Sequence, residues 1–303
     1  NDRVKIGDFG MSKTATVKQQ LATRCGSTRY ISPEMALMQP GDSYDGRAMD
    51  VWASGVLLVG PVRWAVLASC KAEGEGIASQ SSLLFCDWTL ANYAEVQERS
   101  NYFRHFWNSV VISLGSTVLG LVIAIPAAWS MAFVPGRRTK DVLMWMLSTK
   151  MLPAAAVLYP MTFLTKNVLG IFDTHFLVIV VLCLINLPIV VWMLFTYFKD
   201  IPKDIIEAGQ MDGLNTWGEI KEILIPLAWG GIVSTAVLTF SFCWNEAYWT
   251  VRLTTIDAAT LSKLIEGNRA PEGLFFGRLS AVSTAAVGPI IVLGWFCQKQ
   301  LVQ

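Results

Sequence analysis

The chain has 303 residues, of which 53% are apolar and only 16% are charged, and its formal net charge is +1 at pH 7. This composition is too apolar for an ordinary soluble domain, and so small a net charge argues against a nucleic-acid partner. Six cysteines without C-x-x-C spacing and two histidines predict neither a metal site nor a disulfide framework.

Residues 1 to about 50 are polar and mixed and differ from the rest of the chain. Three stretches follow one another within residues 1–58: VKIGDFG at 4–10, CGSTRYISPEM at 25–35 and DGRAMDVWASGVLL at 45–58. They resemble the metal-binding triplet, the activation segment and the start of the long buried helix of a Ser/Thr kinase large lobe. The resemblance implies these motif residues: Asp8, Phe9 and Gly10, then Ser32, Pro33 and Glu34, and finally Asp50.

Kinase chemistry also requires a glycine-rich loop, a phosphate-pairing lysine with its glutamate, and a catalytic-loop aspartate and asparagine. The 303 residues contain none of these, so we expect 1–58 to be an incomplete kinase fragment without catalytic activity. A chimeric or truncated reading frame is favoured, with the join near residues 56–61 and a second domain over 59–303. The alternative is a chimeric or membrane-tethered kinase-related protein with a signalling role, in which phosphorylation of Thr23 or Ser27 would gate the rest of the chain.

Long apolar runs dominate the chain beyond these residues. A bilayer core about 30 Å thick needs about 20 apolar residues of helix. Runs of this kind cover 108–134, 142–165, 174–198 and 279–297, and 224–249 is a more polar fifth. A sixth, 51–69, is marginal because Pro61 and Arg63 lie at its middle. Since backbone groups in lipid must be satisfied internally, we predict an all-α membrane bundle of five to six spanning helices.

Orientation follows from the short loops between these runs. The loop at 135–141 carries Arg137, Arg138 and Lys140, whereas the loop at 166–173 carries only Lys166. The first loop is therefore predicted to be cytoplasmic, and alternation places residues 199–223 on the same side.

Residues 199–223 form an amphipathic segment. Pro202 suits a helix start and Gly213 a break, which predicts two short helices joined at the glycine. Composition alone would equally allow an interfacial helix lying on the membrane. The spacing decides the interpretation, because it resembles the EAA loop of bacterial ABC-importer permeases. The matching positions are Glu207, Ala208, Gly209, Asp212, Gly213, Ile223 and Pro226.

In that family the loop docks in a groove of a cytoplasmic ATPase. The chain departs from the motif at Gly209, where a second alanine is usual, and at Ile225, where leucine is usual. Because glycine inside a helix costs about 1 kcal/mol relative to alanine, we expect a looser docking arm here.

The resemblance covers about 60–303 and is closest to maltose-type permeases, in particular subunits for sorbitol and mannitol. Further stretches that carry it include NSVVISLGSTVLGLVIAIPAAWSMA at 108–132, NLPIVVWM at 186–193 and WNEAYWT at 244–250. It implies a multi-pass protein of the cell membrane, in contact with lipid, that is not an enzyme and binds no cofactor. The implied partners are a second permease subunit, an ATPase dimer that holds ATP and magnesium, and an extracytoplasmic protein that binds a sugar or polyol. In such relatives the last outer loop, here 250–278, reaches into the binding protein.

Several polar side chains on the spans are candidates for a substrate pathway. Lys150 lies within its predicted span and must find a partner, either along the pathway or at carbonyls freed by Pro153 and Pro160. The aromatic cluster at 244–249 fits an aromatic belt or a polyol site. The candidate pathway residues are Lys150, Asn186, Trp244, Asn245 and Glu246.

Overall fold

The computed structural model describes residues 62–70, 89–268 and 276–302. The kinase-like motifs within 1–58, and most of the marginal span at 51–69, lie outside these ranges. Every regular element in the described residues is helical, as predicted. A short helix over 62–69 precedes α3 (Ala91–Ser100), α4 (Tyr102–Phe133), α5 (Thr139–Thr149), α6 (Ala154–Phe163), α7 (His175–Lys199), α8 (Lys203–Met211), α9 (Thr216–Gly218), α10 (Ile225–Leu227), α11 (Trp229–Asn245), α12 (Tyr248–Leu253), α13 (Leu261–Gly267) and α14 (Phe276–Val302).

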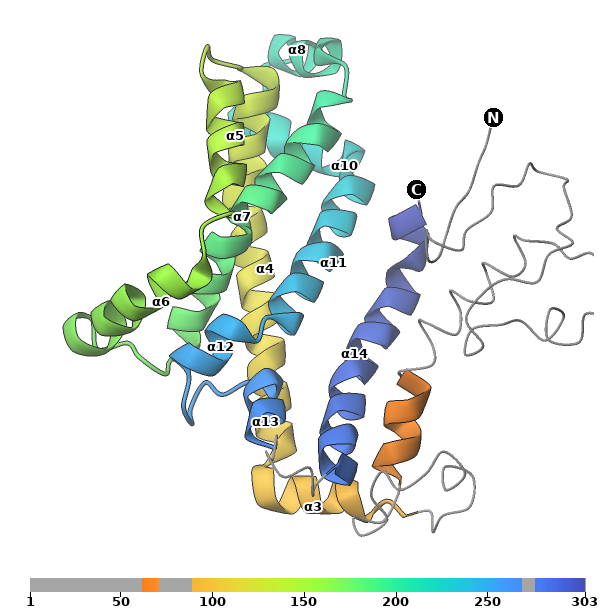
Figure 1. The fold of residues 1–303 in the computed structure, drawn as a ribbon. Helices are drawn as coiled ribbons and strands as arrows, with labels where there is room; N and C mark the ends of the chain where they lie inside the picture. Colours follow the sequence, from red (N-terminus) through yellow and green to blue (C-terminus); the bar gives the residue numbers. More distant parts are fainter. Residues whose placement is uncertain (1–61, 71–88, 269–275, 303) are drawn as a thin grey trace, which may run out of the picture.

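The centre of the bundle is the pair α4 and α7, which run side by side, with α11 packed on both (Figure 1). Helix α14 packs against α11 and α3. Buried residues recur every four positions along one face of α4: Ile112, Ser116, Gly120, Ala124 and Ala128. Four of these five side chains are small, which lets the α7 backbone approach closely. Ser116 uses this proximity, because its Oγ donates to the carbonyls of Ile112 and Ile179.

Two of the predicted spans are broken instead of continuous. Helix α5 and the segment Ala154–Val168 meet at 83°, and so do Thr216–Leu227 and α11. At the first break Pro153 is extended and is the N-cap of α6. Proline interrupts a helix here because it has no N–H to donate and because it disfavours a helical conformation of the residue before it. The second break lies at Ala228, between Pro226 and the pair Gly230 and Gly231, where helix propensity is low. The sequence contains these residues, but a count of apolar residues over a spanning length does not distinguish a bent helix pair from a straight helix.

The number of spanning helices follows from these breaks. Among the described residues, three helices are long and apolar enough to cross a bilayer: Tyr102–Phe133, His175–Lys199 and Gly277–Trp295. The count reaches five if each bent pair is one span. This upper count equals the number of predicted runs, with the runs at 142–165 and 224–249 as the two bent pairs.

Candidate functional site

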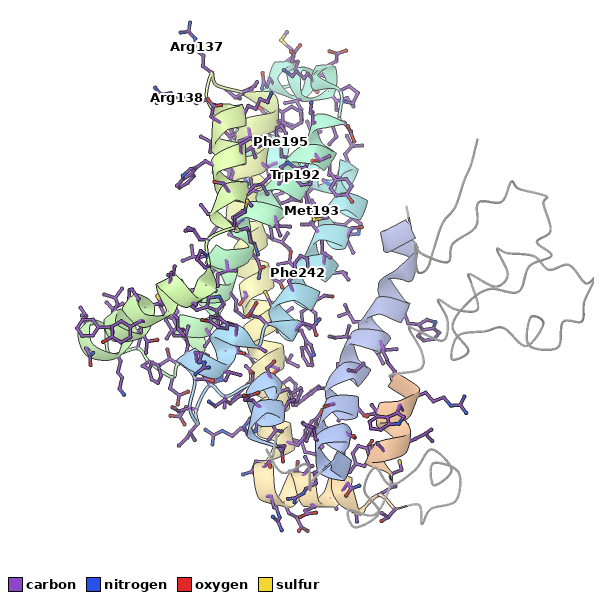
Figure 2. All side chains as sticks on the ribbon, viewed as in Figure 1. Arg137, Arg138, Trp192, Met193, Phe195 and Phe242 are labelled. Carbon is purple, nitrogen blue, oxygen red and sulfur yellow. The ribbon has the colours of Figure 1, made fainter. Side chains whose placement is uncertain are left out.

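The amphipathic segment lies at one end of the bundle, where α8 packs against the π-helical turn Glu219–Leu224 (Figure 1). Arg137 and Arg138 lie at the same end (Figure 2). The basic loop and residues 199–223 thus lie at the same end of the bundle, and their cytoplasmic location stays a prediction.

Two short helical arms joined at a glycine are also what the structure contains. Pro202 is the N-cap of α8, and the chain then turns at Gly213, whose φ is +86°. Asn215 caps the second arm through its Oδ1, which accepts from the backbone N–H of Gly218 at 2.8 Å. This arm continues through the π-helical turn Glu219–Leu224 into α10. A positive φ is strained for any residue with a Cβ, so the turn depends on glycine.

Gly209 packs one arm against the other. It is buried on α8, and a Cβ added there would clash with Cδ1 of Ile223 on the second arm. The looser docking arm expected from helix propensity stays a prediction, and packing acts in the opposite direction, because the missing methyl group lets the two arms meet. The exposed faces of the arms carry two large apolar side chains among charged ones: Met211 is 88% and Trp217 68% exposed, and Glu207 and Asp212 are exposed beside them.

A polar cluster lies at the first bend, where α5, α7 and α11 meet. Lys150 is the C-cap of α5, and its Nζ donates to Oδ1 of Asn186 on α7 at 3.1 Å. Asn186 is buried and its Nδ2 donates to the carbonyl of Leu182 at 3.1 Å and to Sγ of Cys243 on α11 at 3.4 Å. Glu246 lies within electrostatic range of the lysine. The hydrogen-bond partner of Lys150 is thus a side chain of α7, and its role along a pathway stays a prediction.

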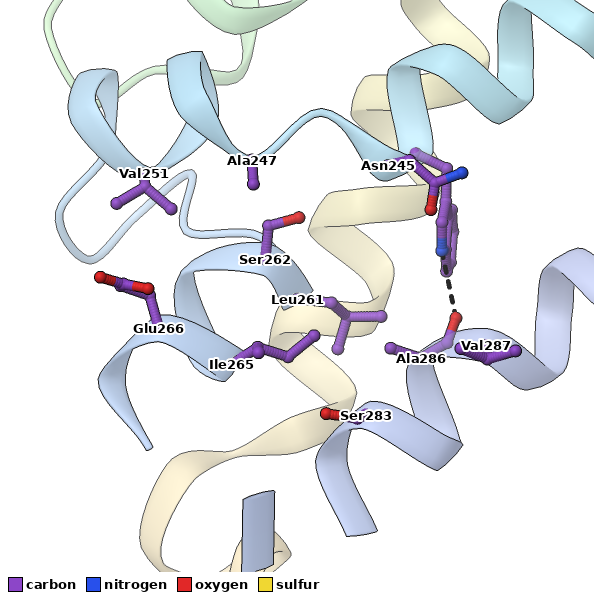
Figure 3. A pocket seen from close by; sticks show the side chains of 11 residues that line it. Asn245, Ala247, Val251, Leu261, Ser262, Ile265, Glu266, Ser283, Ala286 and Val287 are labelled. Carbon is purple, nitrogen blue, oxygen red and sulfur yellow. Dashed lines mark hydrogen bonds between the residues drawn. The ribbon is translucent and has the colours of Figure 1, made fainter. Parts of the chain in front are cut away.

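Trp244 and Asn245 lie apart from this cluster. They line a pocket of about 340 Å³ between the end of α11, α13 and α14, together with Ser262, Glu266 and Ser283 (Figure 3). The Trp244 indole N–H donates to the Ala286 carbonyl at 3.2 Å, and its ring packs on Phe106 and Phe240.

The five candidate pathway residues thus divide into two groups, Lys150, Asn186 and Glu246 in one and Trp244 and Asn245 in the other. The aromatic-belt interpretation is wrong for Trp244 and Trp249, because both rings are buried inside the chain. Glu246 also has a local role, since its Oε1 accepts from the backbone N–H groups of Tyr248 and Trp249 at the start of α12.

The sequence analysis missed Asp173, which precedes α7. Its carboxylate accepts hydrogen bonds from residues 255–258 of the loop between α12 and α13, which was predicted to be extracytoplasmic. The dipeptide Asp173-Thr174 before an apolar run is a helix-start signal, and Thr174 indeed caps α7 by accepting from the N–H of Leu177. That signal marks Asp173 as a polar residue at a helix start, but it does not predict its hydrogen-bond partners, which are more than 80 residues away in the sequence.

The described residues thus have the features of a multi-pass membrane protein: apolar helices and bent helix pairs of spanning length, with an amphipathic helix pair at one end. Residues 106–300 match the family model of the binding-protein-dependent transport system inner membrane component, and the chain belongs to this family. It is therefore an inner-membrane transport subunit and not, in this part, an enzyme. Residues 1–113 also match a protein kinase domain model.

Curated relatives and a solved structure agree with the family. The chain is 28% identical over 243 residues to a protein of Sinorhizobium fredii described as a probable ABC transporter permease, covering 80% of this chain and 87% of that one. It is 27% identical to the trehalose transport system permease protein SugB of Mycobacterium tuberculosis, over 84% of this chain and 92% of the relative. A bacterial ABC transporter that imports the acidic polysaccharide alginate shares the fold, with a TM-score of 0.69, 19% identity, and coverage of 84% and 94%.

Proposed function

We propose that this permease subunit serves an importer of sugars or polyols, with a sorbitol- or mannitol-like substrate. The relatives support a carbohydrate, since one is named for trehalose. The motif-level resemblance of the sequence to sorbitol and mannitol permeases favours a polyol. The proposed partners are a second permease subunit, a cytoplasmic ATPase dimer that carries ATP and magnesium, and an extracytoplasmic substrate-binding protein.

The coupling segment is the feature that carries this proposal. Glu207, Ala208, Gly209, Asp212, Gly213, Ile223 and Pro226 keep the spacing of an ATPase-docking loop, and Gly213 takes the left-handed conformation that such a turn needs. The exposed apolar side chains of Met211 and Trp217 supply a surface for a docking groove. ATPase closure would move the two packed arms as one body and tilt α7 and α11, which adjoin them.

The polar cluster at the first bend is the proposed lining of the pathway. Lys150 and Glu246 offer opposite charges beside the amide of Asn186, a balance that suits a neutral polyhydroxyl compound better than an anion. Trp244 and Asn245, with two serines and a glutamate, form a separate pocket with hydrogen-bonding groups over an apolar wall. We propose that a sugar or polyol passes the first group and that the pocket lies beside its route.

The experiment measures uptake of radiolabelled sorbitol by cells and ATP hydrolysis in their membranes. Glu207→Ala and Gly213→Val should abolish uptake while hydrolysis and membrane insertion persist. Glu222→Gln is the matched control, since it is an exposed carboxylate on the second arm outside the motif. Wild-type uptake by both motif variants would overturn the coupling assignment.

The kinase match favours a second candidate function, a kinase-related signalling role for the N-terminal residues. Its test is transfer of labelled phosphate from ATP by the purified chain. Incorporation that is lost in Asp8→Asn would support this role, and absence of incorporation would exclude catalysis by this chain.

A further inference from the structure

Asp173 holds the outer loop through an unusual number of hydrogen bonds. Its φ of +60° turns the carboxylate toward residues 255–258. Oδ1 accepts from the N–H groups of Thr255 at 2.9 Å and Ala258 at 3.2 Å, and Oδ2 from those of Ile256 at 2.8 Å and Asp257 at 3.1 Å. The Thr255 hydroxyl donates to Oδ2 as well. One side chain therefore satisfies four consecutive backbone donors.

The same loop is held from α4. Asn108 is buried, and its Nδ2 donates to the carbonyls of Asp257 and Ala259, both at 2.9 Å. Its Oδ1 lies 2.8 Å from Nε2 of His175, the first residue of α7. Ser109, the next residue on α4, accepts from the backbone N–H of Leu261 at 2.8 Å. We call the set Asp173, Asn108, Ser109 and His175 the outer latch.

The charge on Asp173 strengthens these contacts. Partial burial raises the pKa of this carboxyl, but the hydrogen bonds from Ile256, Thr255 and Asp257 outweigh it and hold the pKa well below its usual range. Hydrogen bonds between a carboxylate and backbone N–H groups are roughly twice as strong as neutral ones. The inward side of the loop is thus fixed, while Ile256 on its outer side is 69% exposed.

Helix α7 connects this latch to the coupling end. It runs without interruption from His175 to Lys199, about 37 Å at 1.5 Å per residue, and Pro202 starts α8 three residues later. The two ends of α7 lie at opposite ends of the bundle (Figure 1). Its buried side chains Leu182, Leu194 and Phe198 are fully enclosed, so the helix moves with its neighbours as a packed unit.

We propose that Asp173 is a positioning residue that ties outer-loop residues 255–258 to α7, so that a protein bound on this loop and the ATPase-docking arm move together. The inference rests on the proposed function, because it assigns the outer end to an extracytoplasmic binding protein. The exposed Ile256 and the rigid backbone beneath it form a preformed contact for that partner. Contact there biases α7, and α7 carries the bias to α8.

The test uses Asp173→Asn in native membranes that contain the whole transporter. Asparagine keeps one acceptor oxygen and loses the charge, so amide exchange of residues 255–258 should rise at least tenfold. Uptake of radiolabelled sorbitol, and the ATP hydrolysis stimulated by the binding protein, should fall together, while basal hydrolysis stays at the wild-type rate. The matched control is Asp257→Asn, which lies in the same loop and pairs with the exposed Arg104.

Each outcome bears on the proposal. Unchanged exchange in Asp173→Asn would overturn the latch, and faster exchange with full stimulation would overturn the positioning role. If Asp173→Asn fails to insert, Thr255→Val is tested instead, because it removes only the hydrogen bond from the hydroxyl. Lower stimulated ATP hydrolysis with unchanged basal hydrolysis would then support the positioning role, and unchanged stimulated hydrolysis would overturn it. Failure of the proposed function is distinguishable, because then the wild type itself shows no uptake while exchange still reports the latch.

Discussion

Gly209 on the first arm of the coupling segment lies directly against Ile223 on the second arm: a Cβ on residue 209 would overlap Cδ1 of Ile223. An alanine at 209 therefore requires Cδ1 of Ile223 to shift. Gly209→Ala restores the usual motif residue and gains about 1 kcal/mol of helix propensity. Overpacking costs about 1–3 kcal/mol, so the net effect is a destabilised arm and lower uptake. The measurement is sorbitol uptake together with the apparent Tm of the purified protein.

Ile223→Val is the compensating change, because it removes Cδ1 and leaves Cγ1 at 3.8 Å from the new methyl, an ordinary contact. The double variant Gly209→Ala/Ile223→Val should recover uptake and Tm beyond the sum of the single effects, since touching residues are non-additive. Additive behaviour would show that the two arms do not constrain each other.

Gly213 tests backbone strain at the turn. Its φ of +86° disfavours any side chain, so Gly213→Ala should cost about 1–2 kcal/mol locally and reduce uptake. Gly170→Ala is a matched control, because its φ is +64°, nothing crowds its Cβ, and it lies in the loop between α6 and α7. Equal loss of uptake in both variants would mean that strain alone, and not its place in the coupling segment, causes the defect.

The sequence predicted the elements whose signals are local. Five apolar runs, the basic loop at Arg137 and Arg138, and the turn at Gly213 depend on nearby residues, and all appear in the fold. The bends, the burial of Trp244 and the contact between Gly209 and Ile223 depend on tertiary packing. A helix-propensity argument about Gly209 alone leaves out its contact with Ile223 for that reason. Asp173 was missed because its donors are backbone groups, which leave no sequence pattern.

Lys150 and Asn186 form the next test. Lys150→Met removes the donor to Asn186 Oδ1 and leaves a buried acceptor unsatisfied, which costs about 1–3 kcal/mol. We expect lower uptake and a lower apparent Tm. Lys166→Met, at an exposed lysine on the same bent segment, should change neither.

Adding Asn186→Leu to Lys150→Met removes both partners at once. Replacing both by apolar groups can be nearly neutral, so the Tm should recover while uptake stays low if the pair also lines the pathway. Recovery of uptake with Tm would limit the pair to a structural role.

Asp173 should stabilise the fold over a defined pH range. Its folded pKa lies below the value of about 3.9 for an unfolded aspartate, so the ionised carboxylate contributes stability at every pH above that value. The contribution is lost as the pH falls from about 4 toward the folded pKa. The apparent Tm of the wild type should therefore exceed that of Asp173→Asn by a constant margin between about pH 8 and pH 5, and the margin should shrink below about pH 4.

Subtracting the two proteins cancels the titration of neighbouring groups, since Asp257, Arg104 and His175 are present in both. A margin that already shrinks between about pH 7 and pH 5 would show that Asp173 takes up a proton near neutrality, and then the donors at 255–258 could not be holding its charge. A constant margin over that range would show instead that the latch stays ionised whenever the transporter works, so the outer loop is held by geometry and is not switched by pH.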